Sequence, residues 1–173
     1  MLKPQDILTI LKLIRLPSQK PSYQFLASEL CMSKSEIHAA VKRLHASKLL
    51  HQDWRINTTF LAKVLETMPF FFYAKVGKVD YGFPTAWHYG LTDDIRTSLN
   101  ELPHIWANPH GTVCGHSLEP LTKKAPEAAQ KDASLYQLLA WIDCLRVGKV
   151  RERELALEKI QQILHQYDET FSA

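Results

Sequence analysis

The side chains with the clearest capacity for chemistry lie in the stretch SKSEIHAAVKRLHA, residues 33–46. The helix that this stretch predicts has a small, polar and basic outward face: Lys34, Ser35, His38, Ala39, Lys42 and His45, with Arg43 at its margin. Ser33, which opens the helix, is expected to contact DNA together with Lys34, Ser35, His38, Lys42 and Arg43. An apolar stripe at helical spacing occupies the other face: Ile37, Ala40, Val41 and Leu44. Hydroxyl, imidazole and ammonium groups can hydrogen-bond base edges, and basic groups contact phosphates. The pattern therefore predicts a helix that reads the major groove of double-stranded DNA.

Within this hypothesis each residue has a role. Lys34, Ser35 and His38 lie in the first two turns, nearest the base edges, whereas Lys42 and Arg43 lie where phosphates run. The alternative is a helical hairpin in a plain bundle, whose basic face is only solvated. Charge placement favours DNA: residues 1–60 carry nine Lys or Arg against four Asp or Glu, while residues 61–173 carry twelve against fourteen.

The elements that must position this helix follow from caps and periodicity. A first helix is expected from Pro4 to about Leu16, because Pro suits the first helical turn. Ser22 can cap a second helix that runs through Leu30, with Phe25, Leu26 and Leu30 inward. After a turn at Cys31-Met32, Ser33 and Glu36 form the capping box S-K-S-E. The short break lets the second helix brace the third at a steep angle.

Two short strands, 49–52 and 55–56, are predicted around Asp53-Trp54, and Asn57 can cap a fourth helix, TTFLAKVLET. This order of elements, with Leu26-Ala27, Leu30, Ser33, Arg43-Leu44 and Leu49-Leu50, resembles the core of MarR- and ArsR-like bacterial transcription regulators. The resemblance covers residues 4–66 and implies a winged helix-turn-helix. It adds Arg55, in the short hairpin, to the expected DNA-binding residues. The hairpin is short and lacks a turn Gly, unlike the long wings of other members.

The remainder of the chain predicts a loop-rich α/β portion. Strands are expected at Phe70–Val76, Lys78–Tyr81 and Thr112–Leu118, and a helix at Asp93–Leu102. Two helices, Ala133–Val147 and Val150 to about Tyr167, close the chain. The prediction is thus an α+β protein with a DNA-binding domain at residues 1–67 and an α+β domain at 68–173. The second domain would serve dimerisation or the binding of a partner or ligand.

Other candidate sites in this portion favour structural interpretations. His104, His110, Cys114 and His116 could ligate zinc, but they form no CxxC or HxxxH pair, so uncommitted histidines are the preferred interpretation. Asp93-Asp94 suits a helix start more than catalysis. No phosphate-binding Gly-rich loop and no GxSxG motif is present. We therefore expect no enzymatic activity, no metal and no cofactor.

The apolar segments suggest how the chain associates. The aromatic run PFFFYAKV is expected to pack on the last two helices, although a ligand or partner pocket is the alternative. Broad apolar stripes run through residues 135–164, and the resemblance implies that such terminal helices pair two copies. Three widely spaced cysteines and the absence of a signal peptide or membrane span suggest a cytoplasmic protein.

These observations lead to one preferred function and one alternative. The preferred function is a homodimeric transcriptional regulator, a repressor that reads an inverted repeat with the helix at residues 33–46. The alternative is a protein-interaction module, such as an antitoxin-like partner that neutralises an enzyme and also regulates its own operon.

Overall fold

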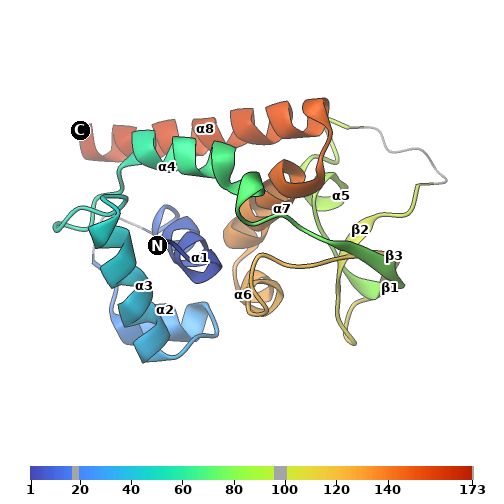
Figure 1. The fold of residues 1–173 in the computed structure, drawn as a ribbon, viewed down its shortest axis with the longest axis horizontal. Coiled ribbons are helices and arrows are strands. Elements are labelled where there is room, and N and C mark those ends of the chain that lie inside the picture. The colour runs from blue at the N-terminus through green and yellow to red at the C-terminus, as the bar shows by residue number, and fades with distance from the viewer. Residues whose placement is uncertain (17–19, 96–100, 173) are drawn as a thin grey trace.

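The chain has an α+β fold in which helices precede and follow a small sheet (Figure 1). The computed structural model describes residues 1–16, 20–95 and 101–172. The first half contains α1 (Pro4–Leu13), α2 (Tyr23–Glu29), α3 (Lys34–Ala46), α4 (Thr58–Thr67) and the 3-10 helix η1 (Met68–Phe70). The second half contains β1 (Val76–Pro84), α5 (Trp87–Gly90), β2 (His104–Ala107), β3 (Val113–Leu118), α6 (Ala125–Lys131), α7 (Ala133–Val147) and α8 (Val150–Ser172).

Three N-terminal helices begin at the caps that the sequence predicts. The Ser22 hydroxyl accepts a hydrogen bond from the Phe25 N–H at 3.1 Å, and the Asn57 side chain accepts one from the Phe60 N–H at 3.0 Å. Ser33 and Glu36 form the predicted capping box. These contacts satisfy N–H groups that have no partner inside their own helix. One side chain differs from the prediction, because Phe25 is exposed.

The strands form one small mixed sheet. β1 runs antiparallel to both β2 and β3, and β2 pairs with β3 in parallel. A Cβ at Gly111 would collide with the Gly82 backbone, so the turn between β2 and β3 needs glycine there. The strand predicted at Phe70–Val76 is wrong, because Met68–Phe70 form a 3-10 helix and the strand β1 begins only at Val76. The two strands expected at 70–76 and 78–81 are replaced by the single strand β1.

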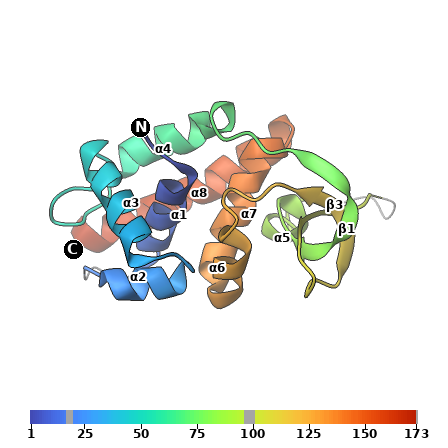
Figure 2. The ribbon, with the colours of Figure 1, turned by 60° about the horizontal axis from the view of Figure 1, so that its bottom comes forward.

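The reading helix predicted from the sequence and the sheet lie at opposite ends of the molecule (Figures 1 and 2). α2 and α3 form one end, the strands form the other, and α6 and α7 lie between them. α8 lies beside α4 and contacts it. This arrangement leaves the outer side of α3 uncovered by the second half of the chain.

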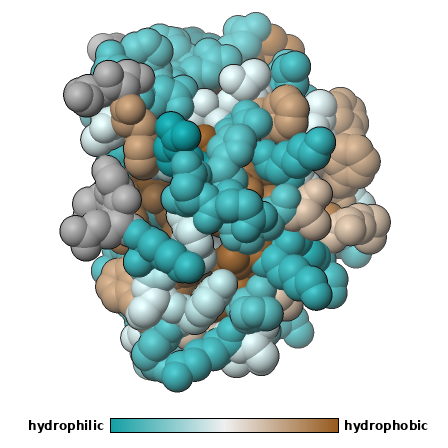
Figure 3. Space-filling model, turned by 90° about the vertical axis from the view of Figure 1, so that its left-hand side faces the viewer, coloured by the Kyte–Doolittle hydropathy of each residue, from teal (hydrophilic) through white to brown (hydrophobic). Residues whose placement is uncertain are grey.

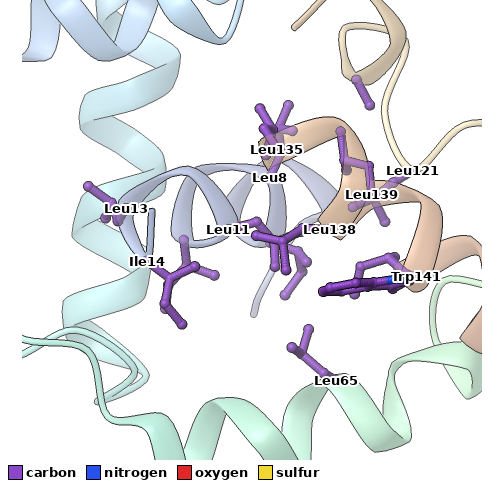
Figure 4. Packing of buried hydrophobic residues seen from close by; sticks show 14 of the residues in the cluster. Leu8, Leu11, Leu13, Ile14, Leu65, Leu121, Leu135, Leu138, Leu139 and Trp141 are labelled. Carbon is purple, nitrogen blue, oxygen red and sulfur yellow. The ribbon is translucent and has the colours of Figure 1, made fainter. Parts of the chain in front are cut away.

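The hydrophobic core joins the two halves. Leu8 and Leu11 of α1 point toward Leu135 and Leu138 of α7, and Leu65 of α4 closes the cluster from another side (Figure 4). These side chains are almost completely buried. The apolar stripe of α7, which we predicted as part of a pairing surface, is therefore buried against other parts of the same chain. One core extends across the predicted boundary between residues 67 and 68, and the division into domains stays a prediction.

A buried polar cluster ties the strands to α7. The Asp143 carboxylate accepts hydrogen bonds from Thr85 at 2.8 Å, Trp106 at 2.7 Å and Arg146 at 2.7 Å. Arg146 also donates to the carbonyls of Phe72 and Glu119. The charges are thus paired and their hydrogen-bonding groups satisfied, as burial requires.

Other elements differ from the sequence expectations in detail. α5, β2 and α6 were not predicted. Of the helix expected at 93–102, residues 93–94 form a turn, residues 101–102 lie outside regular structure, and 96–100 lie outside the described residues. The predictions for β3, α7 and α8 are confirmed, with α8 extending beyond Tyr167.

Candidate nucleic-acid interface

The N-terminus of α3 is fixed by a reciprocal capping box. The Ser33 hydroxyl accepts a hydrogen bond from the Glu36 N–H at 3.2 Å and donates one to the Glu36 carboxylate at 2.7 Å. The same carboxylate accepts from the Ser33 N–H at 2.8 Å. These hydrogen bonds hold the pKa of Glu36 below its usual value, and the bond from the Ser33 backbone N–H has the largest effect. Ser33 is exposed, but its hydroxyl is already engaged in capping the start of α3.

A tight turn sets the direction of α3 relative to α2. Leu30 and Met32 are buried, whereas Cys31 between them has a φ of 54°. The Met32 N–H donates to the Ala27 carbonyl at 3.0 Å, which ties the turn back to α2. A left-handed backbone is uncommon for a residue other than glycine, so the surrounding packing must hold Cys31 in place.

The other side of α3 is anchored to α1 through an ion pair. Arg43 donates to Asp6 through Nε, at 2.8 and 3.1 Å, and through Nη2 at 2.7 Å. Asp6 is completely buried, whereas 26% of the Arg43 side chain is exposed. The bond to Asp6 raises the pKa of Arg43. The sequence predicted Arg43 as a phosphate contact, and the structure instead gives its guanidinium a partner inside the protein.

Four of the predicted residues are exposed on the remaining side of α3, opposite a buried stripe: Lys34, Ser35, His38 and Lys42. The Ser35 and Ser33 hydroxyls lie 3.0 Å apart. Figure 3 shows that the end of the molecule formed by α3 and the neighbouring turn is largely hydrophilic. This face offers cationic groups, a hydroxyl and an imidazole within three helical turns, which is the donor and acceptor set that base edges and phosphates require.

An aromatic cluster that we did not predict borders this face. The Tyr23 ring lies 5.6 Å from the His38 ring and 5.9 Å from the Trp54 ring. Trp54 also contacts His45 at 6.1 Å, and the Lys20 ammonium lies 5.1 Å from the Trp54 ring centroid. The cluster limits the positions that His38 can adopt. Nothing in the sequence marks Tyr23 and Trp54 as neighbours, because 30 residues separate them.

The predicted hairpin is present only as a minimal antiparallel pairing, without two regular strands. Among the described residues, Leu50 and Ile56 form one isolated antiparallel bridge, and residues 51–55 form a turn in which Trp54 has a φ of 68°. Arg55 lies on this turn and donates to Asp53 at 2.8 Å, with both side chains about half exposed. The Tyr167 hydroxyl accepts from the buried Ile56 N–H at 3.1 Å, so α8 supports the turn. Two backbone hydrogen bonds flank the bridge, from the His51 N–H to the Arg55 carbonyl at 2.8 Å and from the Asn57 N–H to the Leu49 carbonyl at 2.9 Å.

The structure also brings a lysine from the second half toward α3. Lys124 lies close enough to Glu36 to lower the pKa of that carboxyl slightly, after the larger effect of Ser33. Lys131 of α6 donates to the Ser28 carbonyl of α2 at 2.7 Å. Two lysines of the second half therefore lie near α2 and α3, which the sequence did not indicate, and the Lys124 ammonium also lies 3.7 Å from the Glu127 carboxylate.

The histidines of the second half form a separate group. His104 pairs with His116 across β2 and β3, and the His88 Nδ1 accepts from the His104 N–H at 3.2 Å. Burial lowers the pKa of His88 to about 4. Within residues 1–16, 20–95 and 101–172, no three His, Cys, Asp or Glu side chains gather as a metal site would require. Of the helices that the structure describes, none has the length and apolar composition of a transmembrane span.

The chain matches no protein-family model, no curated protein sequence and no solved structure.

Proposed function

We propose that the chain is a sequence-specific, DNA-binding transcriptional regulator that acts in the cytoplasm as a homodimer. Its N-terminal part would be a winged helix-turn-helix with α3 as the reading helix and the turn at 51–55 as a reduced wing. The observation that supports this proposal is the set of polar and basic side chains that α3 leaves exposed. The N-terminus of the helix is capped, one side is buried, and Arg43 is ion-paired with Asp6, whereas Lys34, Ser35, His38 and Lys42 are exposed.

The roles of these residues follow from their positions. Ser35 and His38 lie in the first two turns of α3, where a recognition helix meets base edges. Lys42 lies one turn further along, where a phosphate contact is expected, and Lys34 can serve either role. Arg43 is assigned to anchoring, because its guanidinium is already bound to Asp6. Arg55 lies at the edge of the interface and shares its charge with Asp53.

Salt dependence of binding to a random-sequence duplex tests the proposal directly. Each phosphate contact contributes about −0.9 to the slope of log K against log salt concentration. Replacing Lys42 by Ala should therefore weaken binding to all sequences and flatten the slope by about 0.9. Lys149→Ala provides a matched control, because this exposed lysine lies between α7 and α8, away from α3.

The result can contradict the proposal in two ways. Absence of binding at low salt would exclude a DNA-binding function. Equal slopes for the wild type, Lys42→Ala and Lys149→Ala would show that DNA contacts a different surface.

A further inference from the structure

One apolar surface has no partner within the described residues. Phe70 and Phe71 follow α4 directly and are 81% and 73% exposed. Phe60, on the outer side of α4, is also exposed. Beside them lies an apolar groove of about 360 Å³, lined by Met1, Leu2, Val64, Thr67, Met68, Phe71 and Phe72. We call these residues, with Phe60 and Phe70, the η1 patch; large apolar patches on a protein surface mark interaction sites.

The apolar stripes first expected to pair two copies pack largely inside the chain. The apolar side chains of α7 pack against other parts of the same chain: Leu135, Leu138, Leu139, Ile142 and Leu145. Ile160 and Leu164 of α8 are also buried, and the other apolar residues of that stripe are partly buried and pack against the same core: Leu155, Leu157 and Ile163. A homodimer therefore needs a different apolar surface, and the η1 patch is exposed.

We propose that the η1 patch binds the η1 patch of a second copy of this chain across a two-fold axis. A two-fold interface must be self-complementary, because the same surface faces itself. The η1 patch has both parts that this requires, a protruding aromatic side chain in Phe70 and an adjoining apolar groove. Each copy inserts Phe70 into the groove of the other.

The size of the patch agrees with a modest but specific dimer. Phe60, Phe70 and Phe71, with the groove, offer on the order of 500 Å² per copy, given that a fully buried aromatic residue contributes about 150–250 Å². Two copies together then bury about 1,000 Å², which is the lower limit for a specific interface.

The charges beside the patch also favour a second copy. Lys63 and Glu66 are the exposed charged residues of α4, one of each sign. When two α4 helices approach in antiparallel orientation, the lysine of each copy lies toward the glutamate of the other.

This inference deepens the proposed function, which needs two reading helices, but it is tested without DNA. Sedimentation velocity over a concentration series, up to about 100 µM, measures the dimer dissociation constant. Phe70→Lys should raise that constant about 100-fold or more, because each dimer loses two buried aromatic anchors. Val150→Lys is the matched control, since Val150 is 71% exposed but lies at the start of α8, outside the patch.

Two charge variants of α4 test the same dimer interface without changing an apolar side chain. Lys63→Glu places like charges opposite each other and should weaken the dimer, whereas Lys63→Glu combined with Glu66→Lys should restore it. A monomeric wild type at every concentration would overturn the inference. A dimer unaffected by Phe70→Lys would show that the copies pair elsewhere. Neither result decides whether the protein binds DNA, because the salt dependence of DNA binding is measured independently.

Discussion

Replacing Arg43 by Ala separates the anchoring role of this residue from a DNA-contacting role. The substitution removes three charge-assisted hydrogen bonds and leaves the buried Asp6 carboxylate without its cation. Asp6 would keep the bond from the Lys3 N–H at 2.8 Å. Breaking a buried ion pair costs about 3–5 kcal/mol, and the partial exposure of Arg43 places this one at about 3 kcal/mol. That loss is a large fraction of the stability of a typical domain.

Urea denaturation followed by circular dichroism measures this loss. With a typical dependence of stability on urea, a cost of about 3 kcal/mol lowers the unfolding midpoint by about 1 M or more. A cycle with Asp6→Ala and the double variant isolates the pair, and we expect the double variant to lose much less than the two single losses added together. The salt slope of the folded Arg43→Ala protein should match the wild type. A loss below about 0.5 kcal/mol, with a flattened slope, would refute the anchoring role.

Two further predictions concern pH. Asp132 is partly buried, which alone would raise its pKa, but the bond from Lys12 at 2.7 Å and the N–H groups at the start of α7 lower it overall. Asp132→Asn keeps the cap and removes the charge, so it should cost about 1–2 kcal/mol at neutral pH. Because the folded pKa is lowered, this difference should begin to shrink as the pH falls through the ordinary aspartate value near 4, and it should disappear once the pH has passed the lowered folded pKa. A difference that does not shrink as the pH falls from about 7 to below about 4 would contradict the assignment. His88 has its pKa lowered to about 4 by burial, so the unfolded chain binds a proton that the folded chain excludes. Stability should therefore fall between pH 6.5 and 4 by up to about 1.4 kcal/mol per pH unit, and His88→Asn should flatten that dependence in urea titrations. Identical pH profiles for the two proteins would rule out this contribution.

Local signals in the sequence account for most of the N-terminal helices. Ser22, Ser33 and Asn57 each mark a helix start through a side-chain oxygen that a backbone N–H needs nearby. The buried stripe of α3 follows from helical periodicity and is confirmed. Both signals act within a few residues, so the sequence alone contains them.

The features that depend on contacts distant in sequence could not be predicted in this way. Arg43 binds Asp6 across 37 residues, and Tyr23 meets Trp54 only because two turns bring them together. The aromatic run at 70–73 satisfies the composition rule for a strand, yet a 3-10 helix at Met68–Phe70 follows α4 directly, and a turn follows that helix. The apolar stripe of α7 predicts a buried face correctly but cannot tell burial inside the chain from burial against a second copy.

Selection of preferred sites from a random pool of duplex DNA is the most direct test of the central claim that α3 reads DNA sequence. For the wild type we predict an inverted repeat whose half-sites lie about one helical turn apart. Ser35→Ala and His38→Ala should each change the preferred bases within the half-site, since a good base contact discriminates by about 1–3 kcal/mol. Both variants should retain salt-dependent binding to random sequence. Enrichment of one unchanged motif by all three proteins, or of no motif by the wild type, would contradict the assignment of α3 as the reading helix.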